Sequence, residues 1–234
     1  MRKLLIVLAA ILLAAGCQEK DADHAGQYIG DGFRALTESF EIESKTSMNS
    51  EHKILWSKGD QIAINGIASQ PLTEEAEGKA VATFSFNKSL TYPYNIVYPA
   101  PIVELDLSLE GVRAEGTQSV SFLAEQPYKA GTFADDAAPM YAQVAAAGES
   151  IVMKHLAGAL RIAPKGEGVT LTSMTVSAEK GKLAGAFEVD CATGALTASA
   201  EATNVVTVSF GEGLALGAEA TPIYVAVPAG EYGV

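Results

Sequence analysis

Cys17 is the residue whose setting points to the most specific chemistry. It follows the small residues Ala14, Ala15 and Gly16, directly behind an apolar segment at residues 4–13. Small side chains at these positions let a signal peptidase hold the backbone closely, and the Cys17 sulfur can carry a diacylglycerol. The apolar segment follows Arg2 and Lys3, and it has the length of a signal-peptide core but not of a membrane span. We therefore expect cleavage between Gly16 and Cys17, with diacylglycerol and palmitate attached at Cys17.

This N-terminal pattern resembles the lipobox of bacterial lipoproteins. The resemblance implies a signal peptide over residues 1–16 and a mature chain anchored by lipid in the outer membrane, at the cell surface. Residues 17–30 are acidic and polar. They are similar to the surface-export tethers of lipoproteins in Bacteroides-type bacteria. The alternative is an ordinary secretory signal in which the cysteine stays unmodified.

Other residue types that support catalysis or metal binding are not grouped in this sequence. The three histidines, His24, His52 and His155, stand far apart, and none has a cysteine or an acid at the spacing of metal ligands. The short acidic group Asp135-Asp136 lacks the glycine and the distal glutamate of a calcium loop. We expect no enzyme activity, no cofactor and no metal. A secreted enzyme whose catalytic residues the sequence does not reveal remains a third hypothesis.

Composition excludes some partners and predicts a substantial core. Removal of residues 1–16 lowers Lys and Arg from 16 to 14 against 28 Asp and Glu, so the mature net charge is −14. Such a surface repels phosphate backbones, which argues against nucleic-acid binding. Apolar residues make up 48% of the chain, enough for a large core. With Cys17 lipidated, Cys191 has no disulfide partner, and we expect it to be a small buried side chain.

Period-two alternation dominates the rest of the chain and predicts an all-β protein. One helical turn is expected at residues 154–159. Residue 60 follows a Lys-Gly turn, so the Asp60 carboxylate is expected to accept hydrogen bonds from turn amides. The strands that we expect are residues 62–64, 82–86, 104–110, 119–122, 171–176, 184–189, 205–210 and 223–227.

The composition changes along the chain and indicates two domains. A first half rich in Tyr and Pro gives way, near residues 145–150, to a second half rich in Ala and Gly. We expect an N-terminal β-sandwich domain at residues 31–148 and a C-terminal one at residues 149–234. The printed sequence ends soon after the strand at 223–227, which leaves a strand edge open. The missing strand is expected either in a longer chain or from another molecule.

A series of landmarks in a fixed order resembles the fimbrillin-like lipoproteins of Bacteroidales, a family of type V pilus subunits and related surface proteins. The resemblance covers residues 31–227. It implies two β-sandwich domains of transthyretin-like, Greek-key topology, and a structural subunit (stalk, tip or anchor) of an adhesive pilus. The landmarks are Phe33-Arg34-Ala35, Trp56-Ser57-Lys58-Gly59-Asp60-Gln61-Ile62, Tyr92-Pro93-Tyr94, Ala137-Ala138-Pro139-Met140 and His155-Leu156-Ala157-Gly158.

The resemblance also implies a mode of assembly and its partners. In donor-strand exchange, a sandwich that lacks one strand is completed by an extended segment of the next subunit. The resembled pilins lose their first strand to a protease that is often specific for arginine. Arg34 is the arginine beside the first expected strand, so it is the candidate cleavage site. The implied partners are other pilus subunits, the outer membrane through the lipid, and a surface ligand of a host or bacterial cell.

Four aromatic residues are candidates for stacking against a ligand. Trp56 precedes a turn and a strand, and the same position also suits a residue of the core. Tyr92, Tyr94 and Tyr98 alternate with smaller residues and prolines, as expected for an edge strand with its rings at a rim. If these rings are exposed together, the alternative function is a cell-surface glycan-binding lipoprotein.

Overall fold

The structure, a computed structural model, describes residues 28–29, 32–37, 55–101 and 116–232. This part of the chain is built from strands, with one short 3-10 helix, η1 (Glu74–Ala76), so the all-β expectation is confirmed. No helix in these residues is long and apolar enough to cross a membrane. The signal peptide, Gly16, Cys17 and the expected strand at 104–110 lie outside the described residues.

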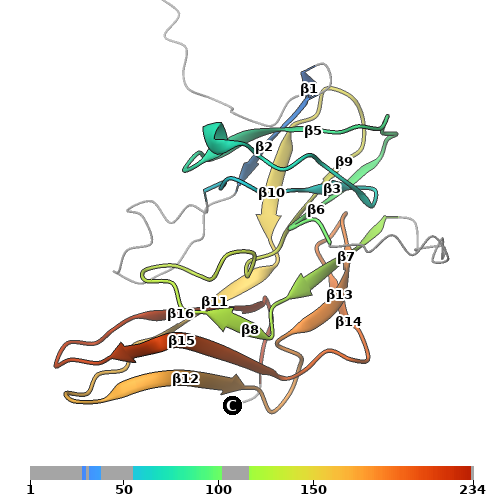
Figure 1. The fold of residues 1–234 in the computed structure, drawn as a ribbon. Helices are drawn as coiled ribbons and strands as arrows, with labels where there is room; N and C mark the ends of the chain where they lie inside the picture. The colour runs from blue at the N-terminus through green and yellow to red at the C-terminus, as the bar shows by residue number, and fades with distance from the viewer. Residues whose placement is uncertain (1–27, 30–31, 38–54, 102–115, 233–234) are drawn as a thin grey trace, which may run out of the picture.

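Eight strands form one sheet in the upper part of Figure 1. Its order is β1-β2-β10-β9-β6-β3-β4. Strand β5 lies outside this order and pairs with β2. All neighbours are antiparallel except β2 and β10, which run parallel. The strands are β1 (Tyr28–Ile29), β2 (Gly32–Thr37), β3 (Ala63–Ile64), β4 (Ile67–Ala68), β5 (Val81–Ser85), β6 (Tyr94–Tyr98), β9 (Met140–Val144) and β10 (Ile151–His155).

The lower part of Figure 1 holds three smaller sheets, with orders β12-β15-β8, β11-β16 and β14-β13-β7. The strands β8 and β15 are parallel, and the other pairs are antiparallel. The strands are β7 (Thr117–Phe122), β8 (Glu125–Pro127), β11 (Ala157–Ile162), β12 (Thr170–Ser177), β13 (Gly185–Asp190), β14 (Leu196–Ala198), β15 (Val205–Ala215) and β16 (Ile223–Pro228).

Three apolar clusters hold these layers together. The upper core is lined by inward residues of the eight-stranded sheet, among them Phe84, Ile96 and Met153. The junction core joins the outer face of that sheet to β7, β13 and β16. The lower core lies between β15 and β16. Successive residues of β16 from Ile223 to Val227 point alternately into the lower core and the junction core, which explains why these five are buried.

Strand pairing crosses the expected boundary between residues 148 and 149. β7 and β8 precede this boundary but pair with β13 and β15, whereas β10 follows it and pairs with β2 and β9. Because strands from each half pair with strands of the other half, the junction core between them is extensive. Pairing alone does not decide which segments fold as units, so the division into residues 31–148 and 149–234 and the transthyretin-like topology stay predictions.

Two local expectations are wrong. The helical turn expected at residues 154–159 is instead the passage from β10 to β11, because pairing with β9 and β16 outweighs the local helix propensity of Leu and Ala. The strand that carries Tyr94 and Tyr98 is not at an edge, since β6 pairs with both β3 and β9. Pro93 and Pro99 flank β6 rather than interrupt it, so they remove no hydrogen bond from its ladders.

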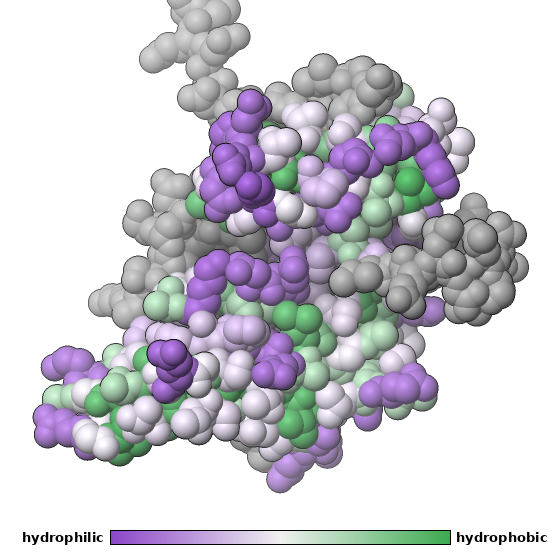
Figure 2. Space-filling model, in the orientation of Figure 1, coloured by the Kyte–Doolittle hydropathy of each residue, from purple (hydrophilic) through white to green (hydrophobic). Residues whose placement is uncertain are grey.

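The hydropathy of the surface differs between the upper and the lower part of the molecule. On the face drawn in Figure 2, hydrophilic residues gather on the upper loops, while the lower part is paler with apolar spots. The pale colour agrees with β12, an eight-residue strand of Thr, Ser, Leu, Met and Val without a charged side chain.

Candidate functional site

Strand β2 occupies a slot between two strands that are distant from it in sequence. Its residues from Gly32 to Leu36 pair antiparallel with β5, and residues from Ala35 to Thr37 pair parallel with β10. Each ladder satisfies backbone groups that would otherwise be unpaired. If β2 were withdrawn, the facing edges of β5 and β10 would both be open.

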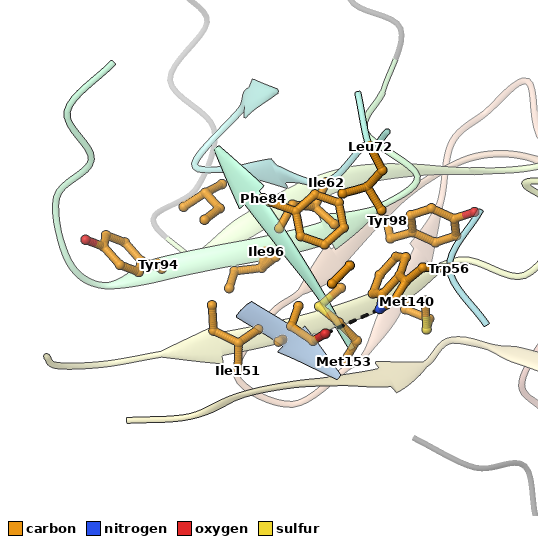
Figure 3. Packing of buried hydrophobic residues seen from close by; sticks show 14 of the residues in the cluster. Trp56, Ile62, Leu72, Phe84, Tyr94, Ile96, Tyr98, Met140, Ile151 and Met153 are labelled. Atoms are coloured by element: carbon orange, nitrogen blue, oxygen red, sulfur yellow. Dashed lines mark hydrogen bonds between the residues drawn. The ribbon is translucent and has the colours of Figure 1, made fainter. Parts of the chain in front are cut away.

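Ala35 is the point at which β2 meets the upper core. It is fully buried, and it lies opposite Ala82 of β5 and Ile151 of β10. Its main-chain oxygen accepts a hydrogen bond from Trp56 Nε1 at 3.3 Å, drawn as the dashed line in Figure 3. The slot therefore takes a small side chain here and places an indole N–H toward the strand's backbone.

Trp56 is enclosed by other aromatic rings. Phe84 of β5 and Tyr98 of β6 pack edge-on against the indole, with ring centroids 5.0 Å and 5.3 Å away. The side chain is 1% exposed, and Figure 3 shows it among the buried residues of the upper core. The main chain of Trp56 is fixed by a bridge to Lys79. The indole thus forms the floor of the slot and offers no open face for a ligand to stack on.

Two carboxylates converge on the hydroxyl of Tyr98. Asp60 Oδ1 lies 3.1 Å from this hydroxyl oxygen, and Asp136 Oδ1 lies 3.3 Å from it. The Tyr98 hydroxyl has a single hydrogen, so it donates to one carboxylate at a time. Burial raises the pKa of Asp60, and the negative charges of Asp136 and Asp135 add to this effect. Burial and the same two carboxylates, Asp60 and Asp136, also raise the pKa of Tyr98.

Asp60 has a second partner that sequence reasoning anticipated. Its Oδ2 accepts a hydrogen bond from the backbone N–H of Ser57 at 2.8 Å, which confirms the expected turn. The sequence does not predict the contact of Asp136 with Tyr98, because Asp136 comes from the loop between β8 and β9, 38 residues from Tyr98. A local motif gives no signal for such a distant contact.

The three candidate tyrosines do not share an exposed face. Tyr92 is 38% exposed and stacks on Tyr94 with ring centroids 3.9 Å apart, but Tyr94 and Tyr98 are 6% and 7% exposed. The side chain of Asn65 donates hydrogen bonds to the main-chain oxygens of Thr91 and Pro93 and so fixes the loop that carries Tyr92. Of the four aromatic candidates, Tyr92 alone presents much of its ring to solvent.

Comparisons with known proteins name no family for this chain. A scan against protein-family models and a search of the curated proteins both find no match. Among solved structures, the chain is similar to a candidate cell adhesion protein from Bacteroides ovatus ATCC 8483, at 14% sequence identity and a TM-score of 0.44. This match covers 86% of the chain and 78% of that protein's chain. A likeness at this level does not establish a shared function.

The candidate cleavage site lies within the slot strand. Arg34 is a backbone partner of Thr83 in the ladder between β2 and β5. A protease binds its substrate in an extended form with free backbone groups, so β2 must leave the sheet before the bond after Arg34 can be cut. Cleavage would leave three residues of β2, from Ala35 to Thr37, in the remaining chain.

Cys191 is a buried thiol without a disulfide, at 1% exposure. Burial, with a smaller contribution from the charge of Asp190, raises its pKa to about 12. The group therefore stays protonated at neutral pH and packs as a small apolar side chain. Across the described residues, no group of three or more His, Cys, Asp or Glu side chains could hold a metal ion.

Proposed function

We propose that this chain is a fimbrillin-like cell-surface lipoprotein that serves as a structural subunit of an adhesive pilus assembled by donor-strand exchange. The observation that supports this proposal is the position of β2 between β5 and β10. A strand bound by backbone ladders on both sides can be replaced by any extended segment that makes the same ladders. We assign no catalysis to the chain.

The contacts at the centre of the slot favour replacement of β2 by another strand, because they depend little on the side chains of the strand. At its buried centre β2 contributes a small side chain, Ala35, and its carbonyl oxygen to Trp56. An incoming strand needs only a small residue at this position, because a carbonyl oxygen is present in every residue. The specificity of the slot then comes from the size limit at Ala35 and from the register of the two ladders.

Exposure of the empty slot would drive assembly. Trp56, Phe84 and Met153 are each at most 1% exposed while the upper core is complete. Displacement of β2, including residues 35–37 that stay in the cut chain, uncovers part of this apolar surface, and re-covering it contributes about 25 cal/mol per Å². The two open strand edges add unpaired backbone groups that an incoming strand satisfies. Together these terms favour a tight contact between subunits.

The lipid on Cys17 fits this proposal as a temporary or permanent anchor. Cleavage after Arg34 separates the lipidated N-terminus from the rest of the chain, so a cut subunit is free to polymerise. An uncut subunit stays in the outer membrane and suits an anchor role. The proposed partners are therefore neighbouring subunits, the membrane through the lipid, and a surface ligand of a host or bacterial cell.

An arginine-specific protease tests the proposal on the purified protein. We expect cleavage after Arg34 together with a ladder of multimers that survives SDS without boiling. The variant Arg34→Ala should give no ladder. The matched control Arg161→Ala, in strand β11, removes an exposed arginine elsewhere and should leave the ladder intact. A chain that is cut after Arg34 and stays monomeric would contradict the proposal.

The alternative, a glycan-binding lipoprotein that stacks sugars on Trp56 and the tyrosine cluster, has less support. Trp56, Tyr94 and Tyr98 are buried, which leaves Tyr92 as the exposed ring of the set. One ring already stacked on Tyr94 makes a small platform. We therefore do not place a sugar site on these residues.

A further inference from the structure

A polar pocket of about 260 Å³ lies on the outer face of β9 and β10. The wall opposite this face is the turn that follows β13, at residues 191–192. Because side chains alternate along a strand, the outward residues of β9 and β10 line the pocket while their neighbours fill the upper core. The lining side chains used below are Tyr141, Gln143, Ser150, Val152 and Lys154.

The pocket is held open by a fixed turn. Asp190 accepts hydrogen bonds from the backbone N–H groups of Ala192 and Thr193, and Tyr141 donates its hydroxyl hydrogen to the Thr193 main-chain oxygen at 3.3 Å. Gly194 has a φ of +78°, and a Cβ at this position would collide with the Tyr141 hydroxyl. The turn and the tyrosine ring thus fit only because residue 194 is glycine.

The charged side chain in the described lining of the pocket is Lys154, whose sign is opposite to the net charge of the protein. Among the residues that the structure describes, no acid lines the pocket and none forms an ion pair with Lys154. Asp190, beside the pocket turn, keeps its negative charge, and its Oδ1 accepts hydrogen bonds from the backbone N–H groups of Ala192 and Thr193. In a chain of net charge −12, the exposed Lys154 ammonium is the charged group among the described lining residues, and it can attract an anionic group into the pocket.

We propose that this pocket binds a single carboxylate-bearing sugar unit, such as a hexuronic acid within an otherwise neutral glycan. The Lys154 ammonium pairs with one carboxylate. The Gln143 side chain, whose Nε2 already donates to Asn95 Oδ1 at 2.8 Å, offers its Oε1 to a sugar hydroxyl, and the Ser150 hydroxyl binds a second one. Val152, 41% exposed, and the Tyr141 ring supply an apolar surface for the C–H face of the sugar. With one cation and a strongly acidic chain around it, the pocket disfavours polyanions and phosphate groups.

This site is independent of the slot that holds β2. Its residues lie on the opposite side of the sheet from Ala35 and Trp56, because Met153 and Ile151 point into the upper core while Val152 and Lys154 point outward. A subunit that polymerises through the slot keeps the pocket available. Success or failure of sugar binding therefore does not depend on the assembly proposal.

A pair of matched sugars tests the inference by NMR titration of the purified protein. Methyl β-D-glucuronide and methyl β-D-glucoside differ only at C6, which is a carboxylate in the first and a hydroxymethyl group in the second. We expect the glucuronide to shift amide signals of β9, β10 and the 191–194 turn, and to bind at least tenfold more tightly than the glucoside. Added salt should weaken the glucuronide interaction.

Two lysine variants localise the effect. Lys154→Gln should lower glucuronide affinity at least tenfold, and the control Lys165→Gln, an exposed loop lysine, should bind as the wild type does. Amide spectra of both variants report directly on whether they are folded. Absence of shifts with the glucuronide, equal binding of the two sugars, or unchanged binding by a folded Lys154→Gln protein would each overturn the inference.

Discussion

The indole Nε1–H of Trp56 donates a hydrogen bond to the main-chain oxygen of Ala35, 3.3 Å away and 21 residues earlier in the chain. This bond joins the indole at the floor of the slot to a strand that is also held by backbone ladders with β1, β5 and β10. It is also independent of the side chain at position 35, so it suits a slot that accepts different strands. The energetics of this pair can be measured directly.

Substitution Trp56→Phe tests the contribution of the indole. The ring of phenylalanine retains apolar packing against Phe84 and Tyr98 but loses the N–H and leaves a cavity. We expect unfolding in urea, followed by circular dichroism, to show a loss of about 2 to 4 kcal/mol from the bond and the cavity together. Tyr92→Phe, at a more exposed ring, is the control and should change stability by less than about 0.5 kcal/mol. Equal effects of the two variants would mean that Trp56 does not hold the slot.

The size limit of the slot is tested by Ala35→Leu. Ala35 is fully buried, so three added carbon atoms must displace neighbours, and overpacking of this kind costs about 1 to 3 kcal/mol. Ala198→Leu, at an exposed position of β14, is the matched control and should be close to neutral. The midpoint of urea unfolding measures both. A neutral Ala35→Leu would show that β2 is not seated against the core.

Gln126 is expected to be the most sensitive polar residue of the lower part. β16 pairs with β11 on one edge, and on the other edge the Gln126 amide exchanges two hydrogen bonds with the backbone of Ala226, of 2.7 Å and 3.0 Å. Gln126→Leu leaves the buried N–H and C=O of Ala226 without these partners and should cost about 2 to 4 kcal/mol. Gln70→Leu, at an exposed glutamine, provides the comparison, and similar losses in both variants would contradict the account.

The Asp60 carboxyl predicts a pH dependence with a definite sign. Its pKa is raised in the folded protein, so folding favours the protonated form. The stabilisation is present below the usual pKa near 3.8 and is lost as pH rises through the raised folded value. Asp60→Asn has no such titration. We therefore expect the variant to gain stability relative to the wild type between about pH 3.5 and pH 7 in urea titrations. If the stability of the variant relative to the wild type stays constant or falls as pH rises, Asp60 is not held in a buried, like-charged setting.

Sequence patterns anticipated the elements whose causes are local. Seven of the eight expected strands coincide with described strands, because alternation at residues such as 82–86 and 205–210 reflects one buried and one exposed face. The eighth, residues 104–110, lies outside the described residues. The turn bond of Asp60 to Ser57 is likewise local.

The contacts that sequence patterns missed are those made over long distances in the chain. Gln126 meets Ala226 across 100 residues, and Asp136 meets Tyr98 across 38. The crossing of β7, β8 and β10 between the two halves depends on the same kind of pairing. A single sequence carries no periodic signal for any of these contacts. The hydrogen bonds of Gln126 to β16 and the pair of carboxylates at Tyr98 are therefore visible only in the folded chain.

The most direct test of the central claim is the intact mass and N-terminal sequence of the polymeric form, purified from its native envelope. If β2 is the strand that is exchanged, SDS-resistant multimers should contain chains that begin at Ala35, and lipidated chains that begin at Cys17 should be confined to the monomer or to one end of each polymer. Multimers in which every chain begins at a lipidated Cys17 would contradict exchange at this slot.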